Sequence, residues 1–207
     1  MSSFTPRRDP ISDHLLTPEN AALIIIDYQP VQVNSINSMS RKQLIENIIT
    51  VTKIAKAFNL PILLSTVNVE TGKNQDTIPS LKEVLGKDVI SYDRTSINAW
   101  EDVEFNQAIK AMGRKKLLMC ALWTEACLTF PTLDALKEGY EVFPIVDAVG
   151  GTSKLAHKAS LRRVEQAGAQ LTSIVQIACE LQRDWNREDT ADDFVKVMME
   201  NGAFLKM

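Results

Sequence analysis

The stretch KLLMCALWTEACLTFPTLDALKEG, residues 116–139, places a short apolar run directly before a segment with helical spacing. The run KLLMCALW (116–123) is apolar at nearly every position, which is typical of a strand buried on both faces of a sheet. The segment TEACLTFPTLDALKEG (124–139) ends at Gly139, a residue suited to the position just after a helix. A buried strand followed by a helix is the repeating unit of an α/β fold.

The same unit recurs on both sides of this stretch. Apolar runs predict six strands, at residues 21–25, 61–68, 88–94, 116–123, 141–148 and 169–176. Helical patterns predict helices at residues 41–58, 79–85, 98–113, 124–139 and 153–168, with further helix after residue 176. Such an order predicts a parallel sheet covered on both faces. We expect one domain over residues 1–207, with an N-terminal arm at 1–18 and a C-terminal helical arm at 187–207.

Composition limits the class of protein. The chain has 207 residues, 45% of them hydrophobic, and a net charge of −3, so it can bury a full core without disulfides or metal. Its three cysteines form no CxxC pair and have no zinc-type spacing with the two histidines. No apolar run reaches the ~20 residues of a membrane span, and residues 1–20 lack the apolar core of a signal peptide. We expect a cytoplasmic protein with no membrane or nucleic-acid partner.

Three reactive side chains follow strands of the predicted sheet. Asp27 comes after the first strand, Arg94 ends the third, and Cys127 lies in the first turn of the helix after the fourth. Active sites of parallel sheets lie beyond the carboxyl ends of the strands. An acid, a cation and a thiol at this edge predict a nucleophilic site with Asp27 as general base. The structural alternative is that Asp27 only pairs with Arg94 or caps a loop.

The three cysteines have different surroundings in the sequence. Cys120 lies inside an apolar strand and Cys179 among apolar helical residues, so both are predicted to be buried and inert. Thr124 is a good N-cap, which puts Cys127 in the first helical turn, where the helix dipole lowers a thiol pKa. The alternative for Cys127 is a small residue that packs the start of the helix.

With these residues in place, the chain resembles the isochorismatase-like cysteine hydrolases, and within them the YcaC-like branch. The matching pieces extend over residues 19–187 and are ALIIIDYQ (22–29), VETG (69–72), INAW (97–100), LWTEACLTFPTLDALKEGYEVFPIVDA (122–148), AGAQL (167–171) and ACELQRDW (178–185). The resemblance implies three αβα layers with a six-stranded parallel sheet and Rossmann-type winding. It also implies a homo-oligomer.

The resemblance implies roles for particular residues. The family's Asp–Lys–Cys catalytic set falls on Asp27, Arg94 and Cys127, so that arginine replaces lysine at the second position. Arginine stays charged and cannot shuttle a proton. The family has a cis peptide bond before the nucleophile helix, which here is Leu122–Trp123. The N–H groups of Trp123 and Cys127 would then form the oxyanion hole.

A metal or cofactor is not expected. Nicotinamidase relatives bind a metal through an Asp and histidines after the second strand, but this region here, STVNVETGKNQDT (65–77), has no histidine. No GxGxxG motif follows any strand, which argues against a dinucleotide oxidoreductase. A dehalogenase-type phosphatase would need a second acid two residues after Asp27, where this chain has Gln29.

The expected activity is hydrolysis of a small amide-like C–N substrate through a thioester on Cys127. Asn98, Trp100 and Glu70 are the substrate-binding candidates. The alternative is that Asn98 is an N-cap, Trp100 a core aromatic and Glu70 a strand end. A second interpretation of the whole chain is a catalytically silent, redox or binding homo-oligomer on the same scaffold.

Overall fold

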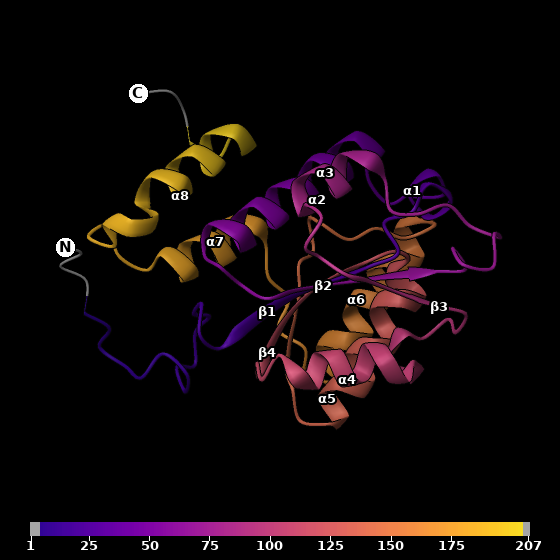
Figure 1. Ribbon diagram of the computed structural model, residues 1–207, viewed down its shortest axis with the longest axis horizontal. Helices are drawn as coiled ribbons and strands as arrows, with labels where there is room; N and C mark the ends of the chain where they lie inside the picture. The colour runs from indigo at the N-terminus through magenta and orange to yellow at the C-terminus, as the bar shows by residue number, and fades with distance from the viewer. Residues whose placement is uncertain (1–4, 205–207) are drawn as a thin grey trace.

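A computed structural model describes residues 5–204. Its centre is one parallel sheet with the strand order β3-β2-β1-β4-β5 (Figure 1). The strands are β1 (Ala21–Ile26), β2 (Ile62–Val67), β3 (Ser91–Arg94), β4 (Lys116–Ala121) and β5 (Glu141–Pro144). Every residue of β1 and β4, which are neighbours inside the sheet, is buried, as their largely apolar runs predict.

Helices cover both faces of the sheet, so the predicted three αβα layers are confirmed (Figure 1). Alternate β1 residues enter two cores: Leu23 and Ile25 pack on one face, Ile24 and Ile26 on the other. The α-helices are α1 (Pro30–Asn34), α2 (Arg41–Ala57), α3 (Pro79–Leu85), α4 (Val103–Ala111), α5 (Thr129–Lys137), α6 (Lys154–Gln166), α7 (Ile174–Gln182) and α8 (Glu188–Asn201). A 3₁₀ helix (Ala99–Glu101) precedes α4, and a π-helix (Thr124–Leu128) precedes α5.

The prediction of a sixth strand at 169–176 is wrong, because the sheet described has five strands. Only Thr172 in this segment makes a bridge, with Ile145, and α7 begins at Ile174. Ile174, Ile177 and Leu181 recur at helical spacing and are buried, so the chain from Ile174 onward forms a helix and not a strand. The same helix leaves Cys179 exposed, which corrects the prediction that it is buried.

Other boundaries were predicted too long. β3 covers only residues 91–94 of the predicted 88–94, and β5 ends at Pro144 rather than at residue 148. The predicted helix 98–113 is interrupted because Asn98 and Asp102 each cap a separate helix, through the N–H groups of Trp100 and Phe105.

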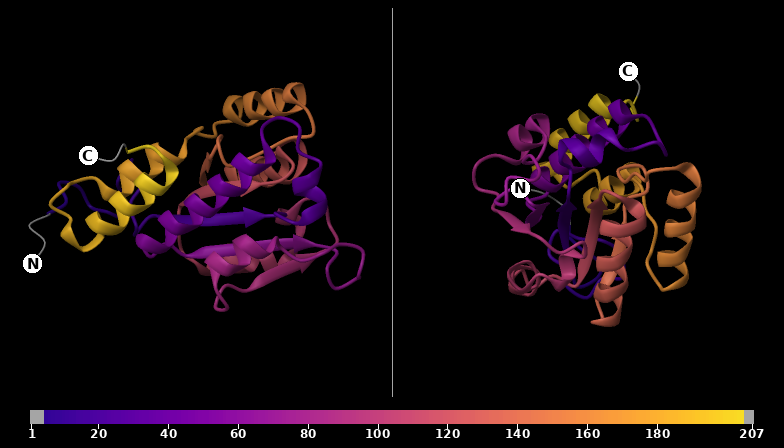
Figure 2. Two further views of the ribbon diagram at one scale, coloured as in Figure 1. Left: turned by 90° about the horizontal axis from the view of Figure 1, so that it is seen from above. Right: turned by 90° about the vertical axis from the view of Figure 1, so that its right-hand side faces the viewer.

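The two predicted arms lie at the amino ends of the strands, away from the arrowheads in the left view of Figure 2. Helix α8 packs on α2 and α7. The parts of the arms at residues 1–4 and 205–207 lie outside the described residues. None of the helices described is both long enough and apolar enough to cross a membrane.

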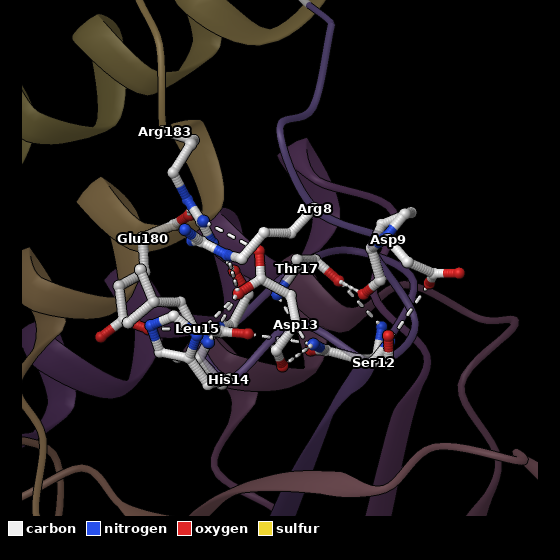
Figure 3. Close-up of polar contacts among 12 residues, drawn as sticks. Arg8, Asp9, Ser12, Asp13, His14, Leu15, Thr17, Glu180 and Arg183 are labelled. Carbon is white, nitrogen blue, oxygen red and sulfur yellow. Dashed lines mark hydrogen bonds and ion pairs between the residues drawn. The ribbon is translucent and has the colours of Figure 1, made fainter.

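Asp13 holds the N-terminal arm to α7 (Figure 3). Its carboxylate accepts hydrogen bonds from Arg8 Nε at 2.8 Å, from Arg183 Nη1 at 3.0 Å and from the Leu15 N–H at 3.0 Å. Burial alone would raise the pKa of Asp13, but these bonds outweigh it and hold the pKa well below its ordinary value.

We expect Asp13→Asn to lower the thermal unfolding temperature near neutral pH, with a difference that disappears in acid. Because the pKa of Asp13 is lowered in the folded chain, its carboxylate stabilises the fold above the unfolded pKa of about 3.9, and this stabilisation is lost as the pH falls toward the folded value. Circular dichroism melts at several pH values measure it, with the exposed Asp192→Asn as control. An equal difference at all pH values would contradict the assignment.

Candidate active site

Asp27 lies just beyond the carboxyl end of β1 with its side chain fully buried. Its backbone has φ 61°, and its N–H donates to the Ser65 carbonyl at 3.0 Å, which continues the pairing of β1 with β2. An ionised carboxylate at such a depth needs charged and hydrogen-bonding partners.

Arg94, at the end of β3, supplies these partners. Its Nη1 and Nη2 donate to Oδ1 and Oδ2 of Asp27, both at 2.8 Å. Nη1 also donates to Ser65 Oγ and to the Thr66 carbonyl, each at 3.0 Å, and Nη2 donates to the Ile97 carbonyl at 3.2 Å. Burial alone would lower the pKa of Arg94, but the hydrogen bonds and charge of Asp27 raise it overall. The pairing that was expected as a structural alternative therefore exists, and it lies at the predicted site.

Cys127 reaches the same point from the segment that follows β4. Its Sγ lies 3.7 Å from the Ile97 carbonyl oxygen that also accepts from Arg94, and only 8% of the residue is exposed. Burial, followed by the nearby Asp27 carboxylate, raises the pKa of the Cys127 thiol. Arg94 and the Trp123 N–H oppose this increase only in part. The structure therefore brings Asp27, Arg94 and Cys127 together, as the sequence predicts.

The prediction of a lowered thiol pKa at Cys127 is wrong. That prediction assumed an α-helix start capped by Thr124, but Trp123 is at the N-cap position and residues 124–128 form a π-helix. Burial and the neighbouring carboxylate outweigh the N–H groups at this start. Burial and the nearby Asp27 carboxylate therefore favour a protonated thiol at rest, with its sulfur 3.7 Å from the Ile97 carbonyl oxygen.

The π-helix is held by side chains around it. Thr124 Oγ1 lies 2.9 Å from Nδ1 of the half-buried His157, and the Thr124 N–H donates to the Gly150 carbonyl at 2.8 Å. Thr129 Oγ1 donates to the Thr124 carbonyl at 2.6 Å. Pro131 has no N–H to donate to the Cys127 carbonyl, which favours an irregular turn at this place.

The peptide bond Leu122–Trp123 is cis, as the family resemblance implies. The Trp123 N–H acts to lower the pKa of the Cys127 thiol, and Trp123 Nε1 donates to Ser35 Oγ at 2.5 Å. The oxyanion hole formed by the N–H groups of Trp123 and Cys127 stays a prediction.

The three substrate-binding candidates make structural contacts. Asn98 accepts from the Trp100 N–H at 3.1 Å and donates to Asp134 at 2.7 Å. Trp100 is buried, and its Nε1 donates to Glu138 at 2.8 Å. These are the contacts that the N-cap and core-aromatic alternatives expect. Glu70 is exposed at the rim of a groove beside the end of β3. Substrate binding by these residues stays a prediction.

Sequence reasoning missed Ser65, Thr66 and Ile97 as parts of the site. Ser65 and Thr66 interrupt the apolar run of β2, and two polar residues at the end of a buried strand were a usable signal. Ile97 contributes only its carbonyl, for which no residue type is diagnostic. Among residues 5–204, no group of three or more His, Cys, Asp and Glu side chains lies close enough to hold a metal ion. The expected independence from metal stays a prediction.

Comparisons with known proteins agree with this site and fold. The family model described as isochorismatase domain matches residues 21–176. The probable hydrolase YcaC of Escherichia coli (strain K12) is 35% identical over 173 residues, which are 84% of this chain and 83% of that protein. A solved structure of YcaC from Pseudomonas aeruginosa, with hexane-2,5-diol and covalent acrylamide, is 33% identical and has a TM-score of 0.84 over 96% of this chain and 94% of that chain.

A second solved structure, of the ycaC gene product from Escherichia coli, is described as an octameric hydrolase of unknown specificity. It is 32% identical and has a TM-score of 0.79 over 92% of this chain and 98% of that chain. The chain belongs to the isochorismatase domain family, and its resemblance to the YcaC branch is confirmed. The chain is a YcaC-like hydrolase of this family.

We expect Asp27→Asn to lower the thiol pKa of Cys127, because it removes the carboxylate that opposes ionisation and leaves Arg94 as the counter-ion. The pH dependence of iodoacetamide labelling at Cys127, followed by mass spectrometry, measures this shift. The exposed Asp88→Asn is the control. A labelling midpoint that stays in place or moves to higher pH would show that Asp27 does not raise the thiol pKa.

Proposed function

We propose that this chain is a cysteine-dependent hydrolase that cleaves small amide-like C–N bonds through a thioester. One observation carries the proposal. The buried Asp27 carboxylate, which Arg94 holds by two hydrogen bonds of 2.8 Å, lies close enough to the Cys127 thiol to raise its pKa. A nucleophile beside a base that a third group orients is the arrangement that acyl transfer needs.

In the first half-reaction, the Cys127 sulfur attacks the carbonyl carbon while its proton moves to Asp27. The raised pKa of the thiol favours transfer during attack over a standing thiolate, because the nearby base can take the proton as the S–C bond forms. The oxyanion is held by the N–H groups of Trp123 and Cys127. The C–N bond then breaks, and Asp27 gives its proton to the leaving amine.

In the second half-reaction, Asp27 takes a proton from a water molecule that attacks the thioester. The S–C bond breaks, the carboxylic acid leaves, and the proton returns to the Cys127 sulfur, which restores the resting site. Arg94 keeps its proton throughout, because both Nη atoms are bonded to Asp27 and an arginine does not titrate in this range. Its role is to orient Asp27 and to offset its charge.

The relatives support this assignment. The Escherichia coli structure is described as a hydrolase, and the Pseudomonas aeruginosa structure contains covalent acrylamide, an electrophile that reacts with thiols. The absence of a disulfide at Cys120, Cys127 and Cys179 is compatible with the reducing cytoplasm.

We expect Cys127→Ala to abolish hydrolysis of a panel of small amides and Cys127→Ser to reduce it by about 100-fold or more, because the sulfur forms the intermediate. Ammonia or amine release measures turnover, and intact-mass spectrometry of wild type detects an acyl adduct on Cys127. Cys179→Ser, an exposed position on α7, is the matched control and retains activity. Turnover that survives in Cys127→Ala would contradict the mechanism.

A second candidate is a redox or binding protein on the same scaffold, without turnover. The observation that favours it is the 8% exposure of Cys127, which limits access to the sulfur. Thiol modification of Cys127 by small electrophiles, without hydrolysis of any amide in the panel, would favour this candidate.

We also propose a homo-oligomer, because the Escherichia coli relative is octameric. Light scattering coupled to size-exclusion chromatography is expected to give a mass several times that of one chain. A monomer mass at micromolar concentration would contradict this proposal.

A further inference from the structure

The charges at the candidate active site cancel. Asp27 carries one negative charge and Arg94 one positive charge, and they are joined by two hydrogen bonds of 2.8 Å in a buried place. The Cys127 thiol is neutral at rest, because burial and the charge of Asp27 raise its pKa. The residues that meet at the sulfur therefore offer no net positive charge to an incoming molecule.

Arg94, the cation among these three residues, already uses both of its Nη atoms in hydrogen bonds within the protein. Both Nη atoms of Arg94 bond to Asp27, and they also bond to Ser65, Thr66 and Ile97. Its Nε–H is buried without a hydrogen-bond partner. A carboxylate is held best by two parallel N–H donors or by a free charge. A single N–H can instead serve one neutral carbonyl or hydroxyl oxygen.

A groove of about 620 Å³ borders β3 and the start of α4, and Asp93, the neighbour of Arg94 in the chain, lines it. Its lining includes Glu70, Asp93, Glu101, Asp102 and Glu104, and the residues that line it include no lysine or arginine. The Asp93 carboxylate accepts the N–H groups of Val69 and Glu70, which together with Thr66 and the charge of Arg94 outweigh burial and lower its pKa.

The negative charges of this groove act electrostatically on the candidate active site. Asp93 and Asp102 both interact electrostatically with Arg94, the residue that orients Asp27. An anion that comes near the ion pair therefore also meets the negative potential of these two carboxylates. Fields of this kind change the arrival rates of charged molecules by about 10- to 1000-fold at low ionic strength.

We propose that this site selects small amides that carry no negative charge and excludes carboxylate-bearing ones. The proposal rests on the hydrolase function proposed above, since it names the substrate class of the same site. Selection arises from repulsion of the wrong ligand and from the missing partner for a carboxylate, rather than from an added contact to the right ligand.

The test compares two reagents of nearly equal size: iodoacetamide, which is uncharged, and iodoacetate, which is anionic. Both alkylate the same thiolate, so their rate ratio at Cys127 does not depend on the thiol pKa. The exposed Cys179 on the same chain and free 2-mercaptoethanol are the references. After normalisation, we expect iodoacetamide to be favoured at Cys127 by about tenfold, with the preference reduced at ~1 M salt, where the screening length is ~3 Å. An equal or reversed ratio at Cys127 would overturn the proposal.

A variant pair tests the source of the selection. Glu70→Gln with Glu104→Gln removes two exposed charges of the groove and is expected to reduce the preference severalfold. Glu188→Gln, on α8 at the opposite end of the molecule, is the control and leaves the ratio unchanged (Figure 2). An unchanged ratio in the double variant would show that the charges of the groove are not a source of the selection.

Turnover separates the two proposals. Butanamide, 4-aminobutanamide and succinamate share a four-carbon amide frame and differ in the charge at the far end. We expect kcat/KM for succinamate to be about tenfold or more below that for butanamide, with 4-aminobutanamide at least as good as butanamide. Succinamate as the best substrate would overturn the charge selection but leave the hydrolase function standing. No Cys127-dependent hydrolysis together with the expected alkylation ratio would contradict the hydrolase function alone.

Discussion

The ion pair between Asp27 and Arg94 is the interaction on which the site depends. One guanidinium joins the end of β1 to the end of β2, through Ser65 and Thr66, and to the loop after β3, through the Ile97 carbonyl. Removing one partner of a buried pair leaves an uncompensated charge and typically costs about 3–5 kcal/mol. The pair therefore couples the geometry of three separate chain segments to a single contact.

The same ion pair bears on the protonation of the Cys127 sulfur. The Ile97 carbonyl that accepts from Arg94 also lies 3.7 Å from Cys127 Sγ, and the Asp27 carboxylate is near enough to raise the pKa of the thiol. Burial and this carboxylate raise the pKa of the thiol against the opposing effects of Arg94 and the Trp123 N–H. In the proposed reaction the thiolate forms only as the S–C bond forms.

Arginine in place of the family's lysine suits this arrangement. A lysine ammonium is a compact charge that can lose its proton when buried, whereas a guanidinium presents a planar fork and stays charged. The fork uses both Nη atoms on the two carboxylate oxygens of Asp27, so Arg94 acts as a fixed part of the scaffold. The proposed proton transfers therefore all pass through Asp27, and the neutral balance of the pair is kept until the thiol ionises.

The sequence by itself determined the layers of the fold and the three residues at the site. The largely apolar runs of β1 and β4 predict burial on both faces, and the carboxyl ends of parallel strands share one edge, so Asp27, Arg94 and Cys127 were expected to lie close together. Only the tertiary structure decided the protonation of the thiol, because pKa depends on burial and on a carboxylate distant in sequence. It also decided that Ile174 begins a helix and that Trp100 packs in the core, because such short apolar segments fit either period until their neighbours are placed.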